Sequence, residues 1–163
     1  MKDRVILVTG SNEGIGYAIA KLCHQQGAKV VLHGLEQAAL KVSANSIGPD
    51  VKFVVADLKD RDAPGKIIEF VMAEHGRIDG LVNNAGMLDR STLETVSSEL
   101  TDLMFAVKFR APLMLTKAAV AEMKTQTTGG NIVNIGSINA GSGAPTLVIY
   151  SATKAALATM TKN

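Results

Sequence analysis

Tyr150 and Lys154 have the residue types and the spacing that proton transfer to a small molecule would use. They are four positions apart in a segment of helical composition, so they share one face of the expected helix. A phenol has a pKa near ~10, and a neighbouring ammonium group lowers that pKa by favouring the phenolate. Acid–base chemistry at a carbinol needs such a shift. Ser137 precedes the pair and could hydrogen-bond and orient a substrate oxygen.

Taken alone, a Tyr–Lys pair at this spacing is most often a pair on a helix surface. Its interpretation as catalytic depends on a second motif, "TGSNEGIG" at residues 9–16, directly after the apolar run "VILV". Gly10 can turn the chain sharply, Gly14 lets the backbone approach a ligand, and Gly16 lets the next helix pack near the sheet. The free N–H groups and positive dipole end of that helix then face an anion such as pyrophosphate. The alternative is a turn with a structural role only.

The elements that must position these residues alternate between strands and helices. Apolar, β-branched runs predict buried strands, and amphipathic stretches with helical spacing predict helices. The expected strands are residues 4–10, 29–34, 51–58, 78–86 and 129–137, and the expected helices are residues 15–26, 36–47, 63–76, 97–124 and 150–163. Pro112 should kink or break the helix over 97–124.

This alternation with short connections predicts the fold class. Right-handed crossovers should build an α/β, doubly wound parallel sheet of Rossmann type in a single dinucleotide-binding domain over residues 1–163. Ligands of such sheets bind beyond the carboxyl ends of the strands, near the point where the strand order reverses. The turns after the strands are therefore where a site is expected.

The composition excludes several other classes of protein. A 47% hydrophobic share, a 20% charged share and a net charge of +2 describe a globular chain with scattered charges, so neither nucleic acid nor a membrane is expected as a partner. The single cysteine, Cys23, and the lack of a recognisable signal peptide favour the cytoplasm. His24, His33 and His75 are dispersed as surface or element-end residues, and no cluster has metal-binding spacing, so no metal site is expected.

Several motifs, in order along the whole chain, resemble those of the short-chain dehydrogenases/reductases. "TGSNEGIG" is similar to the T-G-x-x-x-G-I-G signature of that family and differs from the spacing G-x-G-x-x-G. "DL" at 57–58, "NNAG" at 83–86 and "YSATK" at 150–154, with Ser137 upstream, agree with it. The resemblance implies an NAD(P)-dependent oxidoreductase that transfers hydride between a nicotinamide cofactor and an alcohol or carbonyl substrate, and it implies a homo-oligomer.

The resemblance also implies a role for each matching residue. Tyr150 would be the acid–base group, Lys154 its activator and a holder of the nicotinamide ribose, and Ser137 the group that orients the substrate oxygen. The cofactor-binding residues, in the order pyrophosphate, adenine and adenosine ribose, would be Gly10, Asn12, Ile15 and Gly16, then Asp57 and Leu58, then Asn84, Ala85 and Gly86. Asn83 is expected to brace the sheet. The alternatives are a helix cap at Asp57 and a turn residue at Asn83.

Two departures from the family pattern bear on activity. The stretch "VKFRAP" places Lys108 where the family usually has an Asn that helps to hold a water near Lys154. A second ammonium group there should lower both lysine pKa values or displace one side chain, unless Lys108 points to solvent. The chain also stops at Asn163, inside the helix after strand five, whereas family members continue with two further strands and a substrate-covering segment. We therefore expect a fragment, a cleaved product or the ordered part of a longer protein, and the alternative function is a non-catalytic nucleotide-binding fragment or pseudoenzyme.

The residues near the expected ribose position favour NAD over NADP. Gly34 stands where NAD-dependent relatives have an acidic residue, but Leu35 replaces the arginine that is usual in NADP-dependent ones. Glu13 in the glycine turn would repel a 2′-phosphate. His33 is the nearby candidate for a compensating charge, and it is mostly neutral at its ordinary pKa. The substrate's identity does not follow from the sequence.

Overall fold

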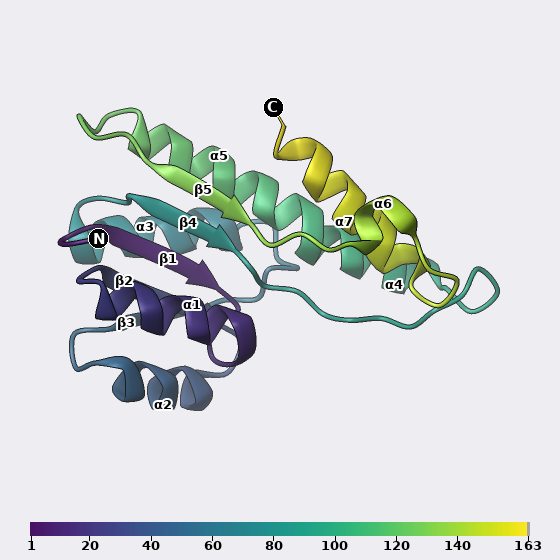
Figure 1. Cartoon of the computed structure of the whole chain (residues 1–163), viewed down its shortest axis with the longest axis horizontal. Helices are drawn as coiled ribbons and strands as arrows, with labels where there is room; N and C mark the ends of the chain where they lie inside the picture. The colour runs from purple at the N-terminus through teal and green to yellow at the C-terminus, as the bar shows by residue number, and fades with distance from the viewer. Residues whose placement is uncertain (163) are drawn as a thin grey trace.

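The computed structural model describes residues 1–162, and a five-stranded parallel sheet forms its centre (Figure 1). The strands are β1 (Val5–Thr9), β2 (Lys29–Gly34), β3 (Lys52–Val55), β4 (Gly80–Asn83) and β5 (Asn131–Asn134). Their order is β3-β2-β1-β4-β5, so the strand order reverses between β1 and β4. This is the Rossmann-like, doubly wound sheet that the alternating pattern predicts.

Helices cover both faces of the sheet and extend beyond its carboxyl edge. They are α1 (Gly14–Gln25), α2 (Gln37–Ile47), α3 (Ala63–His75), α4 (Ser98–Phe105), the π-helical segment η1 (Ala106–Arg110), α5 (Ala111–Met123), α6 (Asn139–Ser142) and α7 (Val148–Met160). In Figure 1, α4, α6 and α7 lie beyond the arrowheads of β4 and β5. No helix within the described residues is long and apolar enough to cross a membrane.

Alternation along β1 divides the core between the two faces. Val5 and Leu7 belong to the apolar cluster that includes residues of α3 and α5. Ile6 and Val8 belong to the cluster formed with α1 and α2. A strand whose every side chain is buried must lie in the middle of a sheet that is covered on both sides. The position of β1 therefore fixes where the glycine turn begins.

The observed elements differ from the expected ones at the carboxyl edge. The third, fourth and fifth strands end at residues 55, 83 and 134, earlier than predicted, because the polar residues that follow leave the sheet and form the edge loops. The short helix α6 was not predicted. The single helix expected over 97–124 is divided into α4, η1 and α5.

The interruption of that helix lies just before Pro112, near the start of α5. Proline has no N–H, so it cannot donate to the carbonyl four residues earlier, that of Lys108. In a π-helical turn each N–H bonds to the carbonyl five residues earlier instead of four. Such a turn accommodates the missing N–H, and the helix continues from α4 through η1 into α5.

Candidate active site

A cavity of about 520 Å³ lies at the carboxyl edge of the sheet, between the glycine turn and the segments that follow β2, β3 and β4. Six of the residues predicted to bind a cofactor line it: Gly10, Asn12, Asp57, Leu58, Ala85 and Gly86. Its lining also includes Met87, Leu103 and Val107, which the sequence did not single out because isolated apolar residues carry no motif. A cavity of similar volume between α3 and α5 contains none of the predicted residues.

The three glycines of the turn have different roles in the structure. A Cβ atom at Gly10 would lie 2.7 Å from the Ala85 Cα, and one at Gly16 would lie 2.3 Å from the Gly10 carbonyl oxygen. Packing therefore requires glycine at both positions. Gly14 has a φ of +58° and no atom within 4 Å of a Cβ position, so its backbone faces open space. The turn thus presents exposed backbone where a ligand would approach.

Asn84 and Thr9 hold the turn against β4. The Asn84 Nδ2 donates to the carbonyl oxygens of Thr9 and Gly10, at 2.9 and 2.8 Å. The Thr9 Oγ1 accepts the N–H groups of Asn84 and Ala85, both at 3.0 Å. The Asn84 amide nitrogen is thus committed to the turn. Thr9 was missed as a functional residue, although it begins the glycine motif.

His33, near the end of β2, hydrogen-bonds the backbone of the glycine turn. Its Nδ1 accepts the N–H of Gly10 at 3.4 Å, and its Nε2 lies 3.1 Å from the Ala56 carbonyl oxygen and so carries the proton. Burial lowers the pKa of His33 to about 4, with the Ala56 bond opposing it. The side chain is 2% exposed, so the surface interpretation is wrong for this histidine. It supplies no positive charge near pH 7.

Asp57 and Leu58 follow β3 at the edge of the cavity. The Asp57 carboxylate accepts the Lys59 N–H at 2.9 Å and pairs with the Lys59 ammonium at 2.8 Å. The Lys59 side chain, and then its N–H group, hold the pKa of Asp57 below its ordinary value. Asp57 closes a turn and does not cap α3, so the helix-cap interpretation is wrong. Leu58 is buried at 4% exposure.

Asn83 braces the sheet, as expected. Its Nδ2 donates to the Asn134 Oδ1 at 2.8 Å and to the Thr116 Oγ1 at 3.3 Å. These bonds link the ends of β4 and β5 to α5. The side chain is buried and takes no part in lining the cavity.

Tyr150 and Lys154 lie one turn apart on α7, with Tyr150 half-buried and Lys154 buried. The Lys154 ammonium donates to the Ile135 carbonyl oxygen, two residues before Ser137, and so fastens α7 to the segment that leaves β5. Burial lowers the pKa of Lys154. The Ser137 Oγ accepts the N–H of Asn139 at 3.2 Å, at the start of α6.

Lys108 enters the same region from η1, and its side chain is only 3% exposed. Its Nζ donates to the Met87 carbonyl oxygen at 3.0 Å and lies 4.4 Å from the centroid of the Tyr150 ring. Burial, and then the charge of Lys154, lower the pKa of Lys108 to about 8. The expectation of a second charge beside Lys154 is confirmed, and the alternative that Lys108 points to solvent is wrong.

This edge of the sheet combines a glycine turn, a cavity and a tyrosine with two neighbouring lysines, and the sequence comparison agrees with it. The family profile described as "short chain dehydrogenase" matches residues 4–163. The chain belongs to the short-chain dehydrogenase family.

Known members are similar to this short-chain dehydrogenase along its whole length. It is 38% identical over 165 residues to the short chain dehydrogenase adrF of Penicillium roqueforti, in a match that covers 100% of this chain and 63% of that protein. The chain thus spans less than two thirds of that relative.

Two solved structures have the same fold. A metagenomic short-chain oxidoreductase in complex with NADP has a TM-score of 0.94 and 32% identity, with 99% of this chain and 75% of that chain covered. The 3-ketoacyl-(acyl-carrier-protein) reductase of Brucella melitensis, complexed with NADH, has a TM-score of 0.92 and 31% identity, with coverages of 99% and 68%.

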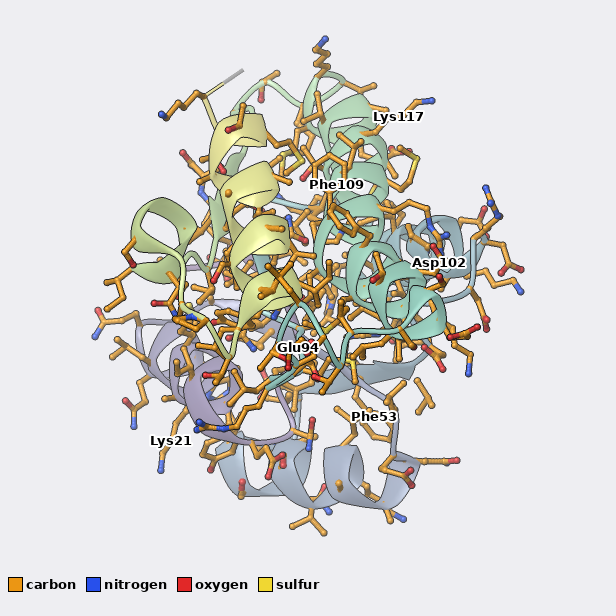
Figure 2. The ribbon with its side chains drawn as sticks, turned by 90° about the vertical axis from the view of Figure 1, so that its right-hand side faces the viewer. Lys21, Phe53, Glu94, Asp102, Phe109 and Lys117 are labelled. Carbon is orange, nitrogen blue, oxygen red and sulfur yellow. The ribbon has the colours of Figure 1, made fainter. Side chains whose placement is uncertain are left out.

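Not every predicted residue of this short-chain dehydrogenase lines the cavity. Gly16 is buried beneath the turn, and Ile15 is 63% exposed on the first turn of α1. Tyr150 and Lys154 lie outside the cavity lining, on α7. Figure 2 looks onto this edge and shows α7 (yellow) beside the continuous α4–η1–α5 rod (green). Within residues 1–162, no group of three or more His, Cys, Asp or Glu side chains could hold a metal ion.

Proposed function

We propose that this chain forms the cofactor-binding and acid–base part of an NAD(P)-dependent oxidoreductase that transfers hydride between a nicotinamide cofactor and an alcohol or carbonyl substrate. The observation that carries the proposal is the exposed glycine turn, which opens onto a cavity where the strand order reverses. Ligands of doubly wound sheets bind at this point. The nicotinamide dinucleotides named with the two solved relatives support the same ligand class.

The residues present fit a dinucleotide in most respects. The helix N-terminus and open backbone at Gly14 suit a pyrophosphate, which Gly10, Asn12, Ile15 and Gly16 would surround. The cavity lining supplies Asp57 and Leu58 for adenine, and Ala85 and Gly86 for the ribose side. Because the amide nitrogen of Asn84 is already bonded, Asn84 would act mainly by holding the turn in place.

Tyr150, Lys154 and Ser137 would perform the proton transfer. The bound cofactor would supply the hydride donor or acceptor. In carbonyl reduction the Tyr150 hydroxyl would give its proton to the substrate oxygen, and in alcohol oxidation the phenolate would take it back. Lys154 would stabilise that phenolate, and the Ser137 hydroxyl would hydrogen-bond the same oxygen. Tyr150 and Lys154 would also contact the nicotinamide ribose.

Binding and turnover, measured side by side, test this function. Isothermal titration with NADH should give saturable binding, and a panel of ketones should be reduced with consumption of NADH. Binding without turnover would support the non-catalytic nucleotide-binding fragment, which Lys108 at the usual asparagine position favours. No binding of either dinucleotide would contradict both.

The charges around the cavity support NAD over NADP. Glu13 and Glu36 both line it, while His33 is neutral and the lining cation Lys59 is already paired with Asp57. A 2′-phosphate there would meet carboxylates at a cost of about 1 kcal/mol or more at partial burial. We therefore expect tighter binding of NAD at low salt and a smaller difference at moderate salt, because ions screen the repulsion. Tighter binding of NADP at every salt concentration would contradict this preference.

Three further expectations accompany this function. A single domain over residues 1–163, a homo-oligomeric assembly and a cytoplasmic location stay predictions. Size-exclusion chromatography with light scattering tests the assembly directly.

A further inference from the structure

We propose that Lys108 is a positioning residue for Tyr150, which stabilises the phenolate by holding an ammonium group over the face of the tyrosine ring. The inference rests on the proposed function only in the role it gives Tyr150. The coupling between the two side chains is a property of the chain itself.

The contacts of Lys108 fix its ammonium group in that place. The Nζ lies 4.4 Å from the centroid of the Tyr150 ring and donates to the Met87 carbonyl oxygen at 3.0 Å. The side chain is 3% exposed, so it cannot relax into bulk water without leaving the site. The carbonyl acts as a fixed anchor that prevents the flexible lysine from moving off the ring.

Gly86 makes room for this arrangement. A Cβ atom at Gly86 would lie 2.8 Å from the Lys108 Nζ. The Gly86 backbone has no positive φ that would itself demand glycine. The loop after β4 thus leaves space for an ammonium group, and any larger residue at position 86 would displace it.

Lys154 has a different anchor. Its ammonium donates to the Ile135 carbonyl oxygen just after β5, while the charge over the aromatic face is that of Lys108. The two lysines therefore approach Tyr150 from different elements. Lys108 lies on η1 and is buried there.

The Lys108 charge has no carboxylate partner within ion-pair distance among the described residues. Charged side chains also occur on the elements packed around Lys108 and in the loop after β4. The basic ones are Lys154 on α7, Lys117 on α5, Arg110 on η1 and Arg90 in the loop, and the acidic ones are Glu99 and Asp102 on α4, Glu122 on α5, and Asp89 and Glu94 in the loop. Burial and Lys154 both lower the pKa of Lys108, to about 8. The Lys108 ammonium group, without a carboxylate partner among these residues, is therefore stabilised when the neighbouring Tyr150 phenol becomes an anion.

The physical effect follows from the ring's charge distribution. A cation over an aromatic face is attracted by the ring quadrupole, and the attraction is larger when both groups are desolvated. Ionising the phenol puts negative charge on the ring and the oxygen, which increases the attraction to a nearby ammonium. Lys108 therefore favours the phenolate, and the phenolate in turn favours the charged form of Lys108.

The composition allows a direct test on the intact chain. It contains two tyrosines and no tryptophan, so a Tyr17→Phe background leaves Tyr150 as the sole source of tyrosinate absorbance in the near ultraviolet. Tyr17 contacts Ser46 at an exposed site and plays no part in the proposed chemistry. The measurement is the pH midpoint of that absorbance, with no cofactor and no substrate present.

A charge that persists at high pH should move the midpoint downward. Lys108 has a pKa of about 8 and is largely neutral where a phenol ionises, so the decisive variant is Lys108→Arg, which stays charged at every pH. We expect its midpoint to lie about one pH unit below those of Lys108→Met and Lys108→Gln, a tenfold change in the ionisation constant. Lys117→Met is the matched control, because Lys117 is exposed on α5 and extends away from the rod in Figure 2. It should leave the midpoint unchanged.

Gly86→Ala, combined with Lys108→Arg, gives a second arm. Its methyl group should displace the cation from the ring and return the midpoint toward that of the neutral variants, with circular dichroism confirming the fold. Should the neutral variants at position 108 fail to fold, this arm supplies the comparison. A midpoint in Lys108→Arg equal to that of the folded comparison variants overturns the proposal, whereas absence of cofactor binding or turnover would overturn the proposed function and leave the titration result intact.

Discussion

Tyr150 combines a hydroxyl that could transfer a proton with a ring that an ammonium group covers. Its helix is held by Lys154 to the segment that follows β5, and its ring faces Lys108, so two different segments set its surroundings. At the scale of single residues, the site depends on basic groups whose pKa values are lowered by burial. Lys108 and His33 are both buried bases with lowered pKa values, yet one meets an aromatic ring and the other supports a backbone turn.

Replacing Tyr150 with Phe should remove turnover without removing cofactor binding. The ring and its packing stay, and only the proton-transfer group is lost, so we expect kcat to fall by at least ~10²-fold while the Kd for the cofactor changes by no more than about threefold. Steady-state kinetics and isothermal titration measure the two effects. Tyr17→Phe is the matched control. A Tyr150→Phe chain with a near-normal rate would refute the assigned role.

His33 should make stability depend on pH. Its folded pKa of about 4 lies below the ordinary value of 6.5, so the unfolded chain takes up the proton first and stability falls as the pH drops through this interval. The full effect is about 3 kcal/mol, from a shift of roughly 2.5 units. Urea unfolding between pH 7 and about pH 4 should show a shallower loss in His33→Gln, which does not titrate. Equal pH dependence in both proteins would contradict this account of the turn.

At the scale of elements, the glycine turn and the interrupted helix decide where functional groups meet. The backbone of Gly14 faces open space, and the Lys108 side chain of η1 faces α7. The glycine turn follows β1 directly, whereas η1 lies between α4 and α5 and contacts α7. The regular parts of the helices and strands mainly hold these short segments in register.

Gly14→Val should weaken cofactor binding at the turn. The side chain would occupy the open space expected for pyrophosphate, so we expect at least a tenfold higher Kd. The positive φ adds a strain of about 1–2 kcal/mol to the fold. Gly129→Val is the matched control, because Gly129 also has a positive φ of 59° and open space, but lies in the loop before β5, away from the glycine turn. Comparable losses of affinity in the two variants would show that strain, and not the ligand site, accounts for the effect.

The sequence predicted the fold class, the five strands in order and the residues that now form the proposed site, for identifiable reasons. Buried parallel strands such as β1 are continuous apolar runs, and the glycine turn and the Tyr150–Lys154 pair have characteristic spacings. The sequence left the direction of the Lys108 side chain open, because the packing of η1 against α7 is a tertiary contact that no local pattern encodes. The roles of His33 and Asn84 depend on side-chain direction at strand ends, which periodicity does not encode.

At the scale of the whole molecule, the proposed function would use the described cavity for one half of a dinucleotide. Six residues assigned to the pyrophosphate, adenine and adenosine ribose line it, while Ile15, Gly16, Asn84, Ser137, Tyr150 and Lys154 lie outside its lining. This distribution would give the adenosine half most of the available contacts. The residues proposed for proton transfer would then lie apart from it, with Tyr150 and Lys154 on α7.

ADP-ribose, which lacks the nicotinamide ring, should therefore bind almost as tightly as NADH. We expect the two Kd values to agree within about tenfold, a difference of no more than about 1.4 kcal/mol. Either ligand at about 100 times its Kd should raise Tm by about 5–10 °C. Titration calorimetry and thermal unfolding provide the measurements. Stabilisation by NADH with none by ADP-ribose would mean that the nicotinamide end carries the affinity.

The bonds from Asn84 and Thr9 to the glycine turn have a consequence for the rate of association. Since these groups are already paired in the free chain, the turn has little conformational freedom left to lose when an anion arrives. The binding surface would already be formed, so no loop would have to become ordered before the ligand binds. Encounter would then proceed in one step at an ordinary diffusive rate, and differences in affinity among variants of the lining would reside in how long the ligand stays.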